Sequence, residues 1–241
     1  MGVGMLVDAH CHAHSLDEEV LGRIEDVIIV IAVSEDLESS LKTLELTEKF
    51  ENIVPFIGIH PWSLEEITQQ EIDEVISLIE RRDDVRGIGE VGLDGKRGNR
   101  EKQMDVFKSF CRLSAEYDLP MNIHARDAWA DVLGILRKMD VESAIIHWYN
   151  GPLSLLEEMR ECGYMITINP AARIQPRHMD VLREAPLDMI LTESDGPYEY
   201  RGLRLGPDMI EDLVKLIAEV KRMPAKDVED AIEFNFRRIF R

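Results

Sequence analysis

Histidine and carboxylate side chains follow several short apolar runs of this sequence. His10 and His12 end the first run, and later runs are followed by His60, Glu90, Asp94, His124, His147 and Asp195. Imidazole and carboxylate groups together suit Zn2+, Mn2+ or a similar divalent ion. Six of these groups, on His10, His12, Glu90, His124, His147 and Asp195, exceed the four ligands that one Zn2+ usually takes. We therefore predict a pair of ions that share a carboxylate.

The first two of these histidines are separated by a single residue. Side chains alternate along a β-strand, so His10 and His12 point to one side and Cys11 points to the other. The chain has 7 histidines, and only His14 and His178 fall outside the strand ends. We expect His14 to be a loop residue after the first strand and His178 to be an exposed residue of a helix.

Eight apolar or β-branched runs mark the strands that must position these groups. The runs are Leu6 to Asp8, Val27 to Val33, Ile53 to Ile59, Arg86 to Val91, Pro120 to His124, Ser143 to His147, Tyr164 to Ile168 and Asp188 to Thr192. Between them, apolar residues recur at helical spacing of three and four residues. Strands that alternate with helices are typical of parallel β/α units.

Eight such units in 241 residues predict a (β/α)8 TIM barrel that forms one domain over residues 1–241, closed by a helical pair from about Pro207 to Phe240. An open doubly wound sheet is the alternative. In a barrel, the carboxyl ends of all strands meet on one face, where the active site lies. The predicted ligands therefore belong to a single site.

The charge of the chain limits the kind of partner that it can bind. Lys and Arg total 28 against 47 Asp and Glu, which gives a formal net charge of −19. Non-specific affinity for nucleic acid comes mostly from Lys and Arg, so a site for DNA must be built locally. The surplus of acid also keeps a protein dispersed in solution.

One local reversal of charge follows the fourth predicted strand. Lys96, Arg97, Arg100 and Lys102 stand there with a single acid, Glu101. We predict contacts to substrate phosphate from this loop, from His60 and from Arg126, with Arg201 and Arg204 after the eighth strand adding to them. Four aromatic residues close to strand ends, which either stack nucleobases or wall the pocket, are Trp62, Trp148, Tyr149 and Tyr198.

The location of the protein is predicted from its apolar runs, N-terminus and cysteines. The longest apolar run, residues 27–33, is far shorter than the roughly 20 residues that span a bilayer, so we expect no membrane partner. The N-terminal residues lack the basic and apolar regions of a secretory signal. The 3 cysteines are odd in number and widely spaced, which favours reduced thiols. These features predict a cytoplasmic protein and leave its oligomeric state open.

Six ordered motifs carry a family resemblance. They are Asp8-Ala9-His10-Cys11-His12, Gly58-Ile59-His60-Pro61, Gly89-Glu90-Val91-Gly92-Leu93-Asp94, Pro120 with His124-Ala125-Arg126, His147 with Gly151, and Glu193-Ser194-Asp195-Gly196-Pro197-Tyr198. Together they resemble the TatD-type metal-dependent hydrolases of the amidohydrolase superfamily. Asn235 and Phe240 resemble the closing segment of that family. Trp148-Tyr149-Asn150 departs from the family, where Phe-Ser is common, and so does the basic loop after Asp94.

The resemblance implies a role for each ligand. His10, His12, Glu90 and Asp195 would hold one ion, and Glu90, His124 and His147 the other, so that Glu90 bridges two divalent ions (Zn, Mg or Mn). It also implies deoxyribonuclease activity, often exonucleolytic on single-stranded DNA. Metal binding lowers the pKa of water to about 7, and we expect the resulting hydroxide to attack a phosphodiester with Asp195 as base and proton shuttle. Glu90 and His60 are the other predicted catalytic residues.

The sequence is also compatible with two other functions. A small-molecule amidohydrolase could use the same ions to cleave a cyclic amide, a lactone or a phosphotriester, and the acidic surface favours it. The basic loop, the order of the motifs and a bridging Glu90 in place of a carboxylated lysine favour the nuclease. A metal-binding protein without catalysis is disfavoured, because the filled core of a barrel has no structural use for these ligands.

Overall fold

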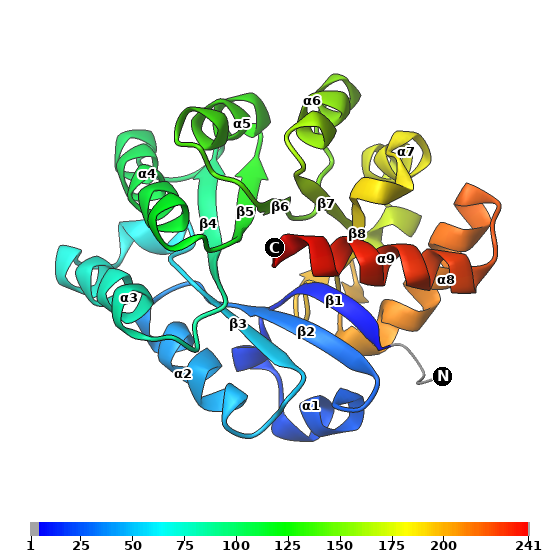
Figure 1. Cartoon of the computed structure of the whole chain (residues 1–241), viewed down its shortest axis with the longest axis horizontal. Coiled ribbons are helices and arrows are strands. Elements are labelled where there is room, and N and C mark those ends of the chain that lie inside the picture. Colours follow the sequence, from blue (N-terminus) through cyan, green and yellow to red (C-terminus); the bar gives the residue numbers. More distant parts are fainter. Residues whose placement is uncertain (1–4, 241) are drawn as a thin grey trace.

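Eight parallel strands form a ring at the centre of the structure, a computed structural model that describes residues 5–240 (Figure 1). They are β1 (Leu6–Cys11), β2 (Ile28–Val33), β3 (Ile53–Ile57), β4 (Gly87–Asp94), β5 (Met121–Arg126), β6 (Ala144–Ile146), β7 (Met165–Ile168) and β8 (Ile190–Thr192). All eight predicted strands are present. Residues 1–4, which begin the N-terminal stretch used to predict location, and residue 241 lie outside the described range.

The strands pair in the order of the chain, β1 to β8. The two ends of this order also meet. The amide of Asp195, after β8, donates to the carbonyl oxygen of His10 at 2.9 Å, and the amide of His12 donates to the carbonyl oxygen of Gly196 at 2.9 Å. A doubly wound sheet would instead reverse its strand order near the middle. The barrel prediction is therefore confirmed, and the open sheet is excluded.

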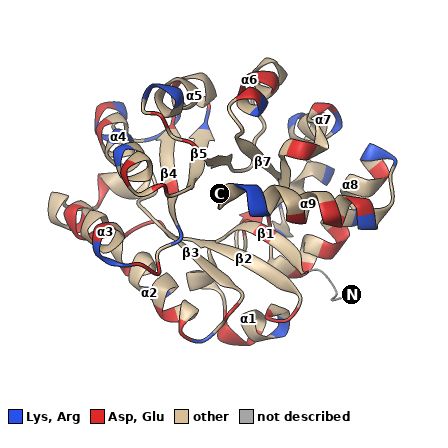
Figure 2. Ribbon diagram, in the orientation of Figure 1, with Lys and Arg blue, Asp and Glu red and all other residues tan. Residues whose placement is uncertain are grey.

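Helices surround the strands on the outside of the ring (Figure 1). They are α1 (Glu18–Ile24), α2 (Leu37–Thr47), α3 (Gln69–Arg81), α4 (Arg100–Tyr117), α5 (Trp129–Lys138), α6 (Leu156–Glu161), α7 (Pro176–Glu184), α8 (Ile210–Lys221) and α9 (Ala225–Ile239). A short antiparallel hairpin, β9 (Glu199–Tyr200) and β10 (Leu203–Arg204), follows β8. The charged residues of the ribbon lie mostly on these outer helices (Figure 2).

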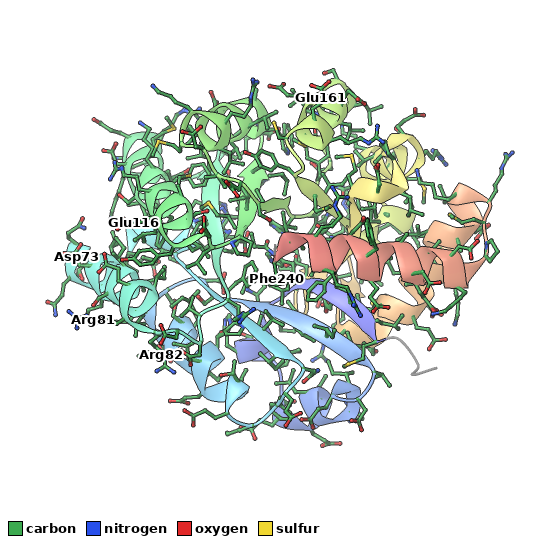
Figure 3. The ribbon with its side chains drawn as sticks, viewed as in Figure 1. Asp73, Arg81, Arg82, Glu116, Glu161 and Phe240 are labelled. Atoms are coloured by element: carbon green, nitrogen blue, oxygen red, sulfur yellow. The ribbon has the colours of Figure 1, made fainter. Side chains whose placement is uncertain are left out.

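Helix α9 differs from the others because it crosses the end of the ring where the strands begin. Ser143, before β6, donates through Oγ to the carbonyl oxygen of Ile239 at 3.1 Å. The ring of Phe240 lies edge-on to Phe56 of β3, with centroids 6.1 Å apart, and Figure 3 shows Phe240 near the middle of this view. Helices α8 and α9 thus form the predicted closing pair, and α9 seals the face opposite the carboxyl ends of the strands.

Within residues 5–240, none of the helices has both the length and the apolar composition that crossing a membrane requires.

Asn235 ties α9 to β8 and generates a test of this closure. Its Nδ2 donates to the carbonyl oxygens of Leu187 at 2.8 Å and Ile190 at 2.9 Å, and the residue is buried. We expect Asn235→Ala to lower the free energy of unfolding by about 1–3 kcal/mol, because buried acceptors lose their donor. Urea denaturation measures the loss. Asp230→Ala, on an exposed position of the same helix, should change stability by less than about 0.5 kcal/mol, and equal losses in the two variants would contradict this role.

Candidate metal centre

Glu90 of β4 lies at the centre of the predicted ligands. Its Oε2 faces His10 Nε2 at 3.4 Å and His12 Nε2 at 3.6 Å. Its Oε1 faces His124 Nδ1 and His147 Nε2, both at 2.9 Å. Because the two oxygens address two different groups of imidazoles, Glu90 has the geometry of a bridging carboxylate.

The first group has the spacing of ligands around one ion. Asp195 Oδ1 lies 3.4 Å from both His10 Nε2 and His12 Nε2. Ligands about 2.1 Å from a tetrahedral ion are about 3.4 Å apart, which matches the separations here. The Nε2 atom of His10 is buried and has no hydrogen-bond partner among the described residues. A divalent ion fits this group because it would satisfy that nitrogen.

The second group contains one residue more than the sequence implied. His124 Nδ1 and His147 Nε2 are 3.5 Å apart beside Glu90. His60 Nε2 also lies 3.3 Å from Glu90 Oε1 and 3.1 Å from His124 Nδ1, so His60, Glu90 and His124 can also be grouped as donors to an ion. The proton on His60 distinguishes it from the others.

The amide of Trp62 donates to His60 Nδ1 at 3.1 Å. The neutral ring then carries its proton on Nε2, which faces Glu90 and the interior of the site. Burial lowers the pKa of His60 below its ordinary value, despite the opposing carboxylate of Glu90. His60 is therefore a neutral hydrogen-bond donor into the site, whereas an ion ligand needs a free lone pair.

The other four histidines of the centre have the opposite arrangement. In each ring one nitrogen faces Glu90, and the outer nitrogen, on the far side of the ring, faces an oxygen atom. The pairs are His10 Nδ1 with Asn122 Oδ1 at 2.8 Å, His124 Nε2 with Asp94 Oδ2 at 3.2 Å, His147 Nδ1 with Glu193 Oε2 at 3.6 Å, and His12 Nδ1 with Glu35 Oε2 at 3.8 Å. For His10 and His124 the separation is that of a hydrogen bond, so the acceptor holds the ring proton on the outer nitrogen and leaves the inner lone pair free. The carboxylates near His147 and His12 lie beyond that distance, and neither Nδ1 atom has a hydrogen-bond partner among residues 5–240. The four inner nitrogens are those that surround Glu90.

The buried carboxylates of the site require positive charge nearby to compensate for their own. Burial opposes ionisation of Glu90, but His60, His147 and His10 hold its pKa well below the usual value of a glutamate. Burial likewise opposes protonation of His10, and the carboxylates of Glu90 and Asp195 outweigh it, so the pKa of His10 lies well above its ordinary value. Divalent cations between these groups would supply the same compensation.

The centre opens into a cavity of about 710 Å3. Three of the predicted substrate residues, Arg126, Trp148 and Tyr198, line it, and so do His60 and Asp195. Arg201, which follows β8, lines it as well.

Lys96 and Arg97 are not among the residues that line this cavity. The Nζ of Lys96 lies 3.5 Å from Asp127, and the Arg97 guanidinium lies over the ring of Trp62, 4.1 Å from its centroid. The rest of the basic loop is also engaged elsewhere, since Arg100 pairs with Asp131 at 2.5 Å. Asp127 and Trp62 themselves line the cavity, so Lys96 and Arg97 lie behind its wall, and their contact with substrate phosphate stays a prediction.

Several residues that complete the site were not among the predicted site residues. Arg177, at the start of α7, and Tyr200, in β9, line the cavity. Glu35, Asn122 and Glu193 face the outer nitrogens described above. Glu35, Asn122 and Glu193 each lie in a strand or shortly after one, and that position was a signal for them. Glu193 also begins the sixth motif, two residues before Asp195, whereas none of the six motifs includes the other four residues.

His178 is buried, and the expectation of an exposed helical residue was wrong. Its Nδ1 donates to the carbonyl oxygen of Tyr149 at 2.8 Å, and its Nε2 accepts from the amide of Asn169 at 3.1 Å. Burial lowers the pKa of His178 to about 4. Asn169 in turn donates to Glu193 Oε1 at 3.0 Å, so His178 supports the carboxylate beside His147. His14 is likewise buried, in the short 3₁₀ turn Ala13–Ser15.

A barrel that gathers imidazoles and carboxylates at the carboxyl ends of its strands has the architecture of the metal-dependent hydrolases. The sequence matches the family described as TatD related DNase over residues 7–241. An uncharacterized metal-dependent hydrolase of Methanocaldococcus jannaschii is 31% identical over 246 aligned positions, which cover 98% of this chain and 96% of that protein. Human deoxyribonuclease TATDN3 is 28% identical over 262 positions, with 99% and 95% of the two chains covered.

Comparison with solved structures leads to the same family. The crystal structure of YjjV, a TatD homologue from Escherichia coli K12, has a TM-score of 0.88 at 25% identity and covers 98% of this chain and 97% of that chain. The chain therefore belongs to the TatD family of metal-dependent hydrolases, and the resemblance drawn from its motifs is confirmed.

Asn122 provides a test of ring orientation in the centre. Its Oδ1 faces His10 Nδ1, and its Nδ2 donates to the carbonyl oxygen of Ala9 at 2.8 Å. We expect Asn122→Ala to weaken Zn2+ affinity by about 10- to 100-fold, because His10 loses the acceptor that fixes its tautomer. Competition with a chelating dye measures the affinity. Asn150→Ala, at the cavity wall, should stay close to the parent, and equal weakening in the two variants would contradict the role.

Proposed function

We propose that this protein is a divalent-metal-dependent nuclease that removes nucleotides from an end of single-stranded DNA. The observation that carries the proposal is the composition of the cavity. Arg126, Arg177 and Arg201 line the same space as Glu90 and its histidines, in a chain whose formal net charge is −19. Guanidinium groups beside an ion site are suited to a phosphodiester, because they bind phosphate oxygens in pairs.

Two sets of residues would hold the ions. The first is His10, His12, Glu90 and Asp195, and the second is Glu90, His124 and His147. When bound, two divalent ions (Zn, Mg or Mn) supply Lewis acidity that activates water and offsets charge on phosphoryl oxygens.

The chain itself orients the substrate and moves the proton. Asp195 borders the cavity, and its backbone is fixed by the bond from its amide to His10 and by the amide of Tyr198, which donates to its carbonyl oxygen at 3.0 Å. We assign Asp195 as the base that takes the proton of the attacking water. His60 Nε2–H is a donor for a phosphoryl oxygen, since Trp62 holds its ring in that tautomer.

The aromatic wall of the cavity suits nucleobases. Trp148 is anchored by the bond from its Nε1 to Gln175 Oε1 at 2.7 Å, and its ring packs edge-on against Tyr200 with centroids 5.2 Å apart. Tyr198 is half-exposed beside them. Stacking on such rings tolerates any base, and one human relative is named a deoxyribonuclease. Both points support DNA as the substrate.

A time course on a 5′-labelled single-stranded oligonucleotide with Mg2+ or Mn2+ tests the proposal. We expect a ladder that shortens in single steps. Asp195→Asn should slow it by about 10^2- to 10^4-fold, the usual contribution of a general base, and Glu90→Gln should abolish it because the bridging charge is lost. Asp131→Asn, an exposed carboxylate outside the cavity, is the matched control.

An intact oligonucleotide in the presence of fully metal-loaded protein would overturn the nuclease. The same protein should then be assayed on a cyclic amide, a lactone and a phosphotriester, since a small-molecule amidohydrolase would use the same centre. Fragments that appear without end-dependence would keep the nuclease and reject the exonuclease.

Salt dependence tests the cavity arginines separately. Each phosphate contact that is removed should lower the slope of log affinity against log salt by about 0.7 for a single strand. We expect Arg126→Ala and Arg201→Ala to reduce both affinity and slope, while Arg100→Ala, whose guanidinium pairs with Asp131, leaves both unchanged. Fluorescence anisotropy of a labelled strand at several salt concentrations measures them. Unchanged slopes for the cavity variants would exclude phosphate contacts there.

A further inference from the structure

His14 and Glu35 form a cluster that neither proposed ion uses. His14 follows β1 in the turn Ala13–Ser15, and Glu35 lies between β2 and α2. The Nε2 atom of His14 is 3.6 Å from Glu35 Oε2. With His12, these residues form a group whose donor atoms all lie within 4.8 Å of one another.

The ring of His14 is poorly satisfied for a buried polar group. The residue is 7% exposed, and its Nδ1 has no hydrogen-bond partner among residues 5–240. Its Nε2 is farther from Glu35 than the 2.7–3.2 Å of an ordinary hydrogen bond. The separation instead equals that between His12 Nε2 and Glu90 Oε2, 3.6 Å, in the first ion group.

The backbone holds Glu35 in place beside the cavity. Its amide donates to Ser39 Oγ at 2.9 Å, and its carbonyl oxygen accepts from the amide of His60 at 2.8 Å. The side chain is 39% exposed and lines the cavity. A carboxylate fixed between the ends of two strands, and open to the cavity on one side, is preorganised for a ligand.

We propose that His14 and Glu35 form a third divalent-cation site, separated from the first ion group by the ring of His12. His12 Nε2 faces Glu90 and Asp195, so its Nδ1 keeps the proton and faces Glu35. The protein therefore supplies two ligands, and water or a substrate oxygen completes the shell, as is usual for ions held by few side chains. One imidazole and one carboxylate suit Mn2+ or Zn2+.

Repulsion from the neighbouring ions makes this site the weakest of the three. Only two protein ligands and one carboxylate charge hold the cation, whereas Glu90 and Asp195 both serve the first ion. The third ion should therefore bind in a separate step at higher metal concentration. The inference adds to the two ions of the proposed function and does not depend on the substrate being DNA.

Titration of metal-free protein with Mn2+, with free Mn2+ followed by its paramagnetic resonance, tests the inference. The parent should bind two ions tightly and a third more weakly. His14→Gln should lose only the third, and Glu35→Gln, whose side chain also faces His12, should lose the third whether or not the first ion group is weakened. Glu38→Gln, on an exposed position in the first turn of α2, is the matched control and should keep all three. Crystals of the parent soaked in Mn2+ should show an anomalous peak between His14 and Glu35, which does not depend on the folding of any variant.

The outcomes separate this inference from the proposed function. Two ions in the parent and in both variants, with no anomalous peak at His14, would overturn the third site and leave the nuclease intact. Protein that binds no ion at Glu90 would overturn the proposed function itself. If Glu35→Gln loses a tightly bound ion while His14→Gln keeps all three, Glu35 acts only through His12, and the third site is rejected.

Discussion

The buried carboxylate of Glu90 is the constraint on which the site depends. An ion of this size taken out of water costs several kcal/mol unless opposite charge meets it. Both of its oxygens are surrounded, with His10 and His12 on one side and His124 and His147 on the other, none farther than 3.6 Å. Those histidines come from β1, β5 and β6, or from the residues just after them. Only a closed ring of strands brings such distant segments around one central side chain.

The orientation of the histidine rings depends on polar residues from other strands of the barrel, which contact the rings from outside the centre. Asn122 of β5 serves His10 of β1, 112 positions away in the chain. Glu193 faces His147 and is held by Thr167 Oγ1 at 2.5 Å and by Asn169, which His178 fixes in turn. The hydrogen bond to Asn122 decides which nitrogen of His10 carries the proton. The strand pairing of the barrel therefore controls the chemistry of the centre, because it brings Asn122 and Glu193 against the outer sides of the rings.

The sequence predicted the strands and the ligand set because both follow from local rules. Alternation places His10 and His12 together, and strand ends in a barrel converge, so position predicted that these side chains would meet. Their roles as metal ligands stay a prediction, because position alone marks His60 and Asp94 equally. Properties that arise from packing were not predictable. His178 looked exposed beside Arg177, yet the chain turns it inward to Tyr149. The basic loop looked free because Asp127, Trp62 and Asp131 are distant in sequence or belong to other loops. Glu35 has no local signature, since its partners are on β1 and in the turn that follows it.

The chain as a whole is acidic, whereas its cavity contains several arginines, and this difference in charge concerns how a phosphate-bearing substrate could bind. A formal charge of −19 repels a polyanion at distances up to the Debye length, about 8 Å at physiological salt. The guanidinium groups that would bind phosphate are gathered in the cavity, on Arg126, Arg177 and Arg201. The positive charge that would meet a phosphate group is therefore concentrated in the cavity, where these three arginines offset the acidic excess of the chain.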